Sequence, residues 1–120
     1  MNKVISFDFD GVIHSYVSGW KGADVIPDFP VKGIKKVLED LKAKDYVIGI
    51  VSSRAITIEG KVAIEKYMAR YELPYDFVTS EKVPSIVLVD DRTISFDGDT
   101  STLVEKIETF KPWYAKEETK

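Results

Sequence analysis

The residues Val4-Ile5-Ser6-Phe7-Asp8-Phe9-Asp10-Gly11-Val12 decide the fold of this chain. A short apolar run, rich in β-branched and aromatic side chains, leads directly into two aspartates and a glycine. Such a run is too brief for a helix and predicts a buried strand that ends in polar residues. By itself an Asp-Gly pair more often marks a turn than a catalytic site, so the rest of the chain has to decide between the two.

Two further runs, residues 46–51 and 85–89, have the same apolar character. Their near-continuous apolarity predicts strands buried on both faces, which is typical of a parallel sheet. Shorter stretches at residues 76–79 and 93–96 predict edge strands. Together these runs predict a mostly parallel sheet of about five strands.

Amphipathic helices are predicted after the strands, because apolar residues recur there at helical spacing. The three sets are Ile34, Val37, Leu38 and Leu41; Ile64, Tyr67, Met68 and Tyr71; and Leu103, Ile107 and Phe110. Strands that alternate with such helices form right-handed crossover units. The sequence therefore predicts an α/β fold, a three-layer α/β/α sandwich around a Rossmann-like sheet.

Length and composition limit what the chain can be. Its 120 residues suit one domain, and 44% apolar residues supply one hydrophobic core. The absence of cysteine excludes disulfide scaffolds, thiolate zinc sites and cysteine nucleophiles. The net charge of −3 does not favour a surface that attracts nucleic acid as a whole. We expect one catalytic domain over residues 1–114 and a solvated tail over 115–120.

Hydropathy predicts a protein outside the membrane. No apolar run approaches the ~18 residues that cross a bilayer, and the N-terminus lacks the apolar stretch of a secretory signal. With the absence of cysteine, this favours a cytoplasmic location and no membrane partner.

Polar residues collect where the three main predicted strands stop. The groups are Asp8 with Asp10, then Ser52-Ser53-Arg54, then Asp90-Asp91-Arg92. The carboxyl ends of parallel strands lie at one edge of the sheet, where α/β proteins bind ligands. Each group alone has a structural explanation, such as a helix cap or a solvated strand end. Their coincidence predicts one site.

Four carboxylates at one edge need a cation. Like charges 4 to 6 Å apart repel by ~1 to 4 kcal/mol per pair, against a domain stability of only ~5 to 15 kcal/mol. The ligands Asp8, Asp10, Asp90 and Asp91 offer only oxygen atoms, which favours Mg²⁺. A hard metal beside serine hydroxyls indicates phosphoryl chemistry.

In the order of these motifs, the chain resembles the haloacid dehalogenase-like superfamily of aspartate-nucleophile phosphohydrolases. Residues 4–12 fit that family's strand followed by Asp-x-Asp-Gly, and residues 48–52 fit its strand ending in serine. Lys82 fits its lysine signature, and residues 86–91 fit its strand ending in paired acids. All four motifs occur in order and cover about residues 3 to 96.

The resemblance implies a catalytic role for four residues. Asp8 would be the nucleophile that accepts the phosphoryl group, and Asp10 the general acid and base. Ser52 would hold a phosphoryl oxygen, and Lys82 would balance negative charge. Three other cations rival Lys82 for that position: Lys61, Lys66 and Arg92.

The resemblance also implies how Mg²⁺ would be held. Asp91 would be a direct ligand, together with the Asp8 carboxylate and the backbone carbonyl of Asp10. Asp90 would either bind the metal ion through a water molecule or contact one of the direct ligands without touching the ion. Which acid of the pair binds directly stays open.

Many members of this family carry a cap domain that selects the substrate, and this chain has no room for one. Residues 11–30 suffice only for a short flap, which implies an open site for bulky phosphorylated substrates such as a nucleic-acid end, or a site closed by another subunit. Within the flap, His14, Tyr16 and Trp20 are candidate substrate contacts. A hydrogen-bonded core histidine and a packing tryptophan are the structural alternatives.

Residues Ser52-Ser53-Arg54 also resemble the Ser-x-Arg of the phosphatase half of polynucleotide end-processing kinases. Ser53 and Arg54 are therefore candidate substrate contacts, since a guanidinium binds phosphate well. The alternative is a surface arginine near a helix start. Trp113 is expected to be a core residue that packs the last helix against the sheet.

The carboxylate cluster together with the resemblance therefore implies a Mg²⁺-dependent phosphomonoesterase that acts through an aspartyl phosphate. One alternative is a catalytically silent relative that binds phosphate or a partner. A second is a phospho-acceptor module like a response-regulator receiver, but here the second strand ends in Ser52 instead of an aspartate. A domain without a cap leaves its site open, and this favours a homo-oligomer in which another subunit covers the site.

Overall fold

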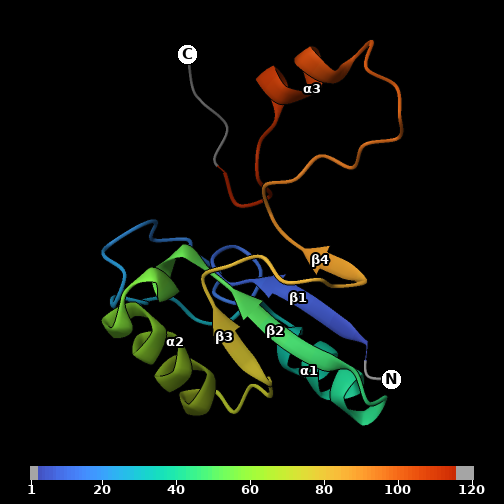
Figure 1. Ribbon diagram of the computed structural model, residues 1–120. Helices are drawn as coiled ribbons and strands as arrows, with labels where there is room; N and C mark the ends of the chain where they lie inside the picture. The colour runs from blue at the N-terminus through green and yellow to red at the C-terminus, as the bar shows by residue number, and fades with distance from the viewer. Residues whose placement is uncertain (1–2, 116–120) are drawn as a thin grey trace.

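The computed structural model describes residues 3–115, which fold around a four-stranded parallel sheet (Figure 1). The elements are β1 (Val4–Asp8), α1 (Ile34–Ala43), β2 (Val47–Val51), the 3₁₀ helix η1 (Ser53–Ile56), α2 (Ile58–Arg70), β3 (Phe77–Thr79), β4 (Val87–Val89) and α3 (Leu103–Thr109). The strand order is β3-β2-β1-β4, so β1 with its terminal aspartate is central. A Rossmann-like α/β fold, as predicted, is therefore present.

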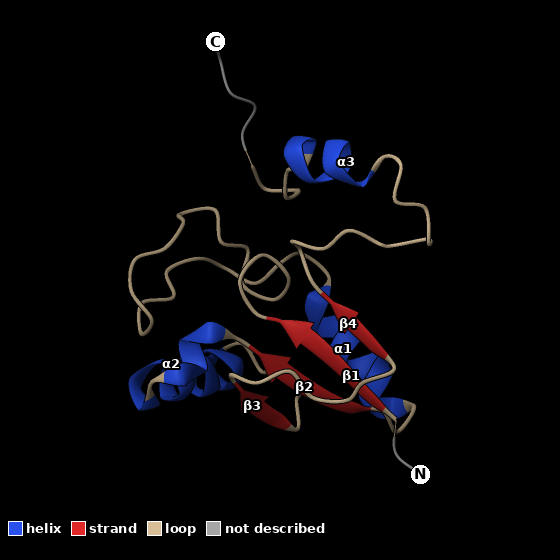
Figure 2. Cartoon of the chain, turned by 45° about the horizontal axis from the view of Figure 1, so that its top comes forward, coloured by secondary structure: helices blue, strands red, loops and turns tan. Residues whose placement is uncertain are grey.

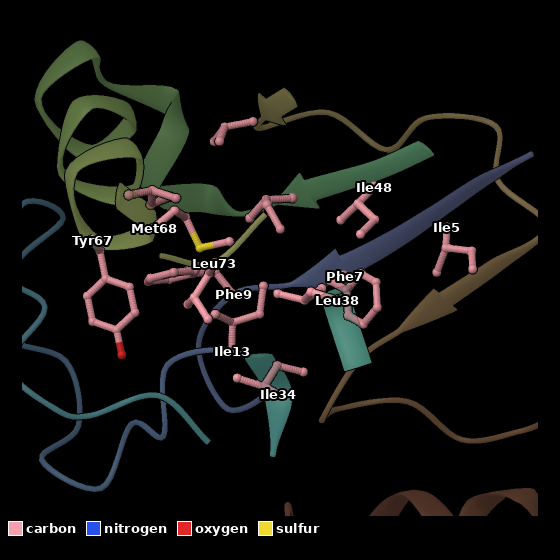
Figure 3. Packing of buried hydrophobic residues seen from close by; sticks show 13 residues of the cluster. Ile5, Phe7, Phe9, Ile13, Ile34, Leu38, Ile48, Tyr67, Met68 and Leu73 are labelled. Carbon is pink, nitrogen blue, oxygen red and sulfur yellow. The ribbon is translucent and has the colours of Figure 1, made fainter. Parts of the chain in front are cut away.

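Helices α1 and α2 bury the same face of the sheet. Ile5 and Phe7 of β1 lie in register with Ile48 and Ile50 of β2, so these four side chains share a face. Figure 3 shows Ile5, Phe7 and Ile48 packed with residues of both helices, namely Ile34, Leu38, Tyr67 and Met68. Ile50 and Ile64 belong to the same buried cluster. This single layer of apolar contacts is the hydrophobic core.

The opposite face of the sheet is crossed by the connection between β3 and β4. Residues 80–86 run from one edge of the sheet to the other, and the Ser85 hydroxyl contacts the Ser6 hydroxyl of the central strand. Among residues 3–115, the helices that join the core are α1 and α2. The structure therefore shows one helical layer where the sequence predicted two.

The segment after β4 departs from the prediction in three respects. Residues 93–96 form no strand, because the chain leaves the sheet after Asp90 and Asp91; among the described residues, no strand pairs with the outer edge of β4. Helix α3 forms, but none of its residues is buried, and it stands clear of the sheet (Figure 2). Trp113 is 61% exposed, so it does not plug that helix onto the sheet.

Two smaller observations complete the fold. Within the described part of the chain, no helix combines the length and apolarity needed to cross a bilayer. The predicted tail falls largely at residues 116–120, which lie outside the described residues.

Candidate active site

Three carboxylates meet where β1 and β4 end. Since the two strands are parallel neighbours, Asp8 at the end of β1 leaves the sheet beside Asp90 and Asp91, which follow β4. One oxygen of each residue lies within 4.8 Å of the others, a spacing at which the three could hold a metal ion. Sequence reasoning brought these residues together, and the strand register explains why they meet.

The surroundings of Asp91 fit a metal ligand. Its side chain is only 2% exposed, and its Oδ1 atom is buried without a hydrogen-bond partner. Buried carboxylate oxygens are normally paired, so an unpaired one beside two further carboxylates is a position that a cation would satisfy. The donor set is purely carboxylate oxygen, which suits a hard divalent ion.

Burial and repulsion perturb the titration of this cluster. Burial, followed by hydrogen bonding and repulsion from Asp91 and Asp90, raises the pKa of Asp8 from 3.8 to about 8. Burial opposes ionisation of Asp91 too, but hydrogen bonds from Asp8 and Tyr114 outweigh it and lower the pKa of Asp91. Without a cation, the proton therefore resides on Asp8, and a metal ion would displace it.

We expect the metal-free protein to lose stability as the pH rises from about 4 to about 8. Over this range the folded chain keeps a proton on Asp8 that the unfolded chain has already released, so unfolding is favoured as protons become scarce. Carboxyls with a lowered pKa, such as Asp76, lose their stabilising effect only below about pH 4. Urea unfolding in EDTA at several pH values measures the slope. A slope of the same size in Asp8→Asn would contradict the assignment.

Asp10 stands beside the cluster, held by two side chains. Its Oδ1 accepts from His14 Nδ1 at 2.8 Å, and its Oδ2 accepts from Arg54 Nε at 2.8 Å. The backbone N–H of Asp28 donates to His14 Nε2 at 3.1 Å, which places the histidine proton on Nδ1. His14 is fully buried and bonded on both sides, so its ring is not exposed for the predicted substrate contact.

Arg54 is the second departure from the predicted substrate contacts. It is fully buried, and its Nη1 donates to the backbone carbonyls of Gly22, Ala23 and Val25 in the flap. Its guanidinium carbon lies 4.6 Å from the centre of the Trp20 ring, which covers it. Arg54 therefore joins the flap to Asp10 and is closed off from solvent.

Ser52 and Ser53 lie at the end of β2, as predicted. Ser52 caps η1, since its hydroxyl accepts from the Arg54 backbone N–H at 3.2 Å. Both serines line a cavity of about 610 Å³ that also contains Asp8 and Lys82. Among the rival cations, Lys66 lines a different groove, between the flap and α2, whereas Lys82 shares this one with the aspartate.

A second, smaller cleft of about 180 Å³ also contains Asp8. It is lined by Asp10, Ser52 and Asp91 and is walled by aromatic side chains of the flap, Tyr16 and Trp20. Arg92 and Tyr114 complete the wall. The Tyr16 and Tyr114 rings meet edge to face with centroids 5.6 Å apart, so the flap and the C-terminal segment close one side of the cleft together.

Sequence reasoning missed this contribution from the C-terminal segment. Tyr114 donates to Asp91 Oδ2 at 2.6 Å, and Trp113 Nε1 donates to the Gly11 carbonyl at 2.6 Å. Gly11 has φ +83°, and a Cβ there would collide with Asp91 and lie 2.6 Å from the Tyr114 ring. The sequence after Pro112 gave no indication of these contacts. A single Trp113-Tyr114 pair forms no recurring pattern from which its position in the fold can be predicted.

The comparisons with known proteins add a likeness of fold. No protein-family model matches the sequence, and no curated protein matches it. One solved chain, described as "Structure of Pnkp1/Rnl/Hen1 complex", superposes with a TM-score of 0.56 at 18% sequence identity. The match covers 95% of this chain and 36% of that one, so this chain spans about a third of its length. The Rossmann-like arrangement described above is therefore shared with a chain of that complex.

Proposed function

We propose that this protein is a metal-dependent phosphomonoesterase of the haloacid dehalogenase-like type, with residues 1–114 as its catalytic domain and Asp8 as its nucleophile. The observation that carries the proposal is the meeting of Asp8, Asp90 and Asp91 at the carboxyl ends of β1 and β4. The cavity that contains Asp8 also contains a serine hydroxyl and a lysine, which suit the oxygens of a phosphoryl group.

In the first half of the reaction, an Asp8 oxygen forms a bond to phosphorus while the bond from phosphorus to the leaving oxygen breaks. In this proposal Asp10 is the general acid that transfers a proton to the leaving oxygen, and His14 and Arg54 hold its carboxyl group in place. In the second half, Asp10 takes a proton from water, whose oxygen attacks the aspartyl phosphate. Inorganic phosphate leaves, and both Asp8 and Asp10 return to their starting forms.

Other residues of the chain hold the substrate. Ser52 would donate its hydroxyl to a phosphoryl oxygen, and the ammonium of Lys82 would offset charge on Asp8 and phosphate. Asp8 and Asp91, with Asp90 beside them, would hold Mg²⁺, which when bound supplies positive charge against the phosphoryl oxygens. His14 and Arg54 keep Asp10 at the edge of the cleft.

The walls of the cleft support a bulky substrate. They consist of the flap and the C-terminal segment, without a separate cap domain among the described residues. Such a cleft suits a phosphate at the end of a large molecule, and a nucleic-acid end is our first candidate. The fold likeness to a chain of the Pnkp1/Rnl/Hen1 complex is compatible with that choice.

The test is phosphate release from a panel of sugar phosphates, nucleotides, a 3′-phosphorylated oligonucleotide and a phosphopeptide, with and without Mg²⁺. We expect metal-dependent turnover, greatest on the oligonucleotide. Turnover that favours a small sugar phosphate would contradict the substrate class alone. Phosphate binding without turnover on any substrate would support the silent binding module instead.

Tyr114→Phe should weaken Mg²⁺ binding by about 10- to 100-fold, the usual effect of removing a group that orients a metal ligand. The hydroxyl that orients Asp91 is lost, while the ring and its contact with Tyr16 remain. Calorimetric titration with Mg²⁺ measures the change. Tyr75→Phe, outside both clefts, is the matched control. Equal affinities in the two variants would show that Tyr114 only packs.

A further inference from the structure

An apolar groove of about 570 Å³ runs between α1 and β4 on the core face of the sheet. It is lined by Ile34, Val37 and Leu41 from α1 and by Val87 and Val89 from β4. Val37 is 45% exposed and Val87 is 53% exposed. Side chains of this kind at a sheet edge normally lie beneath a helix, so this α1–β4 groove is an unfilled part of the core layer.

The same chain carries a helix, α3, whose apolar side chains are exposed in the described structure. We call residues 93–112 the α3 arm; it contains α3 and leaves Val104 68% exposed and Ile107 59% exposed. These two side chains are one helical turn apart and therefore share a face. Figures 1 and 2 both show α3 standing away from the sheet. A helix this short does not persist in water without packing.

We propose that the α3 arm of one chain packs into the α1–β4 groove of a second copy, and that the second copy returns the contact. Both surfaces belong to one chain, so a two-fold dimer satisfies each of them twice. The arrangement places Val104 and Ile107 against the apolar lining contributed by α1 and β4. It fills the helical layer next to β4 that the single chain leaves open.

The charges of the two surfaces support the α3 arm of a second copy as the occupant of the α1–β4 groove. Residues 32–44, on and around α1, carry five lysines and two acids, whereas residues 97–109 of the arm carry four acids and one lysine. Opposite charges at the rim favour encounter of the arm with the groove and fix its orientation. Between two α1 helices, by contrast, the lysines would repel.

The anchors of the arm also favour exchange between copies. Its C-terminal end is held where Trp113 bonds to Gly11 and Tyr114 bonds to Asp91, and Arg92 at its start donates to the Tyr114 hydroxyl at 3.2 Å. Both ends are therefore fixed at the carboxyl ends of the strands, while α3 stands apart from its own sheet (Figure 2). A second copy can receive the helix without any change in these bonds.

The oligomeric state tests the proposal on the full chain. Light scattering after gel filtration should give twice the 13.6 kDa of one chain. Ile107→Asp and Val37→Asp, one on each surface, should each raise the dimer dissociation constant at least tenfold. Thr109→Asp adds the same charge to the opposite side of α3 and should leave it unchanged. A monomer at the highest soluble concentration, or a dimer indifferent to both apolar substitutions, would overturn the proposal.

Cross-linking separates exchange from closure within one chain. Because the chain has no cysteine, Lys36→Cys and Lys106→Cys each introduce a single thiol. When the two variants are mixed, a bismaleimide should join one of each. The double variant should give the same intermolecular product. A double variant that cross-links only within one chain would show that α3 folds onto its own groove, and would reject the dimer.

Discussion

Asp8→Asn is expected to abolish phosphate release and, at the same time, to stabilise the metal-free protein. The loss of activity should be on the order of 10⁴-fold or more, because the amide cannot form the aspartyl phosphate. Activity on a generic aryl phosphate with Mg²⁺ present is the measurement. Residual turnover within tenfold of the parent protein would remove Asp8 from the nucleophile position.

The gain in stability has a separate physical origin. Asp8 is crowded by Asp90 and Asp91, and the amide carries no charge into that cluster. Relief of one like-charge pair is worth ~1 to 4 kcal/mol at the dielectric of a partly exposed site. The difference between the variant and the parent should grow from about pH 4 to about pH 8 and stay constant above, since the pKa of Asp8 is about 8.

Added Mg²⁺ supplies the control for this effect. A divalent ion should raise the melting temperature of the parent protein more than that of Asp8→Asn, because the variant lacks one carboxylate ligand. A variant that is no more stable than the parent in EDTA at pH 8 would show that the three carboxylates do not repel one another. The loss of activity in Asp8→Asn would still test the nucleophile, because that measurement does not depend on the stability of the metal-free protein.

Arg54→Leu is expected to cost about 3 to 5 kcal/mol of folding free energy, the usual effect of removing one partner of a buried ion pair. The substitution leaves Asp10 without one of its two donors and leaves three flap carbonyls unpaired. That is a large share of the stability of a small domain. The flap should become accessible to proteases before the rest of the chain unfolds.

Two further variants sharpen this prediction. Arg54→Lys keeps the charge, but a single ammonium cannot reach both Asp10 and the flap, so it should restore only part of the stability. Arg70→Leu, at an exposed arginine of α2, should change stability little. Urea unfolding of all three measures the differences. If Arg54→Leu unfolds like the parent protein but binds phosphorylated substrate more weakly, the sequence-based prediction of a substrate contact was correct.

The prediction from sequence was strongest where polar residues follow an apolar strand. The run of β1 is apolar up to Asp8 apart from Ser6, and the run of β4 is apolar throughout, so the aspartates at their ends leave the sheet at its edge. The predicted burial of β4 on both faces was wrong, because no helix covers this edge strand among the described residues and all three of its residues are exposed. It was weaker for residues 93–96, whose apolar pattern predicted a strand that did not form. An edge strand needs a partner as well as a pattern, and the chain turns away from β4 before it can pair.

The amino-acid sequence alone determined the four strands, the three α-helices and the position of Asp8 at the carboxyl end of an apolar strand, because hydrophobic periodicity is a local property. Only the tertiary structure decided that Arg54 lies under the flap, that Tyr114 returns to Asp91, and that α3 is left unpartnered. The first two contacts join residues far apart along the chain. Their partners are selected by the free energy of burial and hydrogen bonding, which no repeating pattern in the sequence reveals.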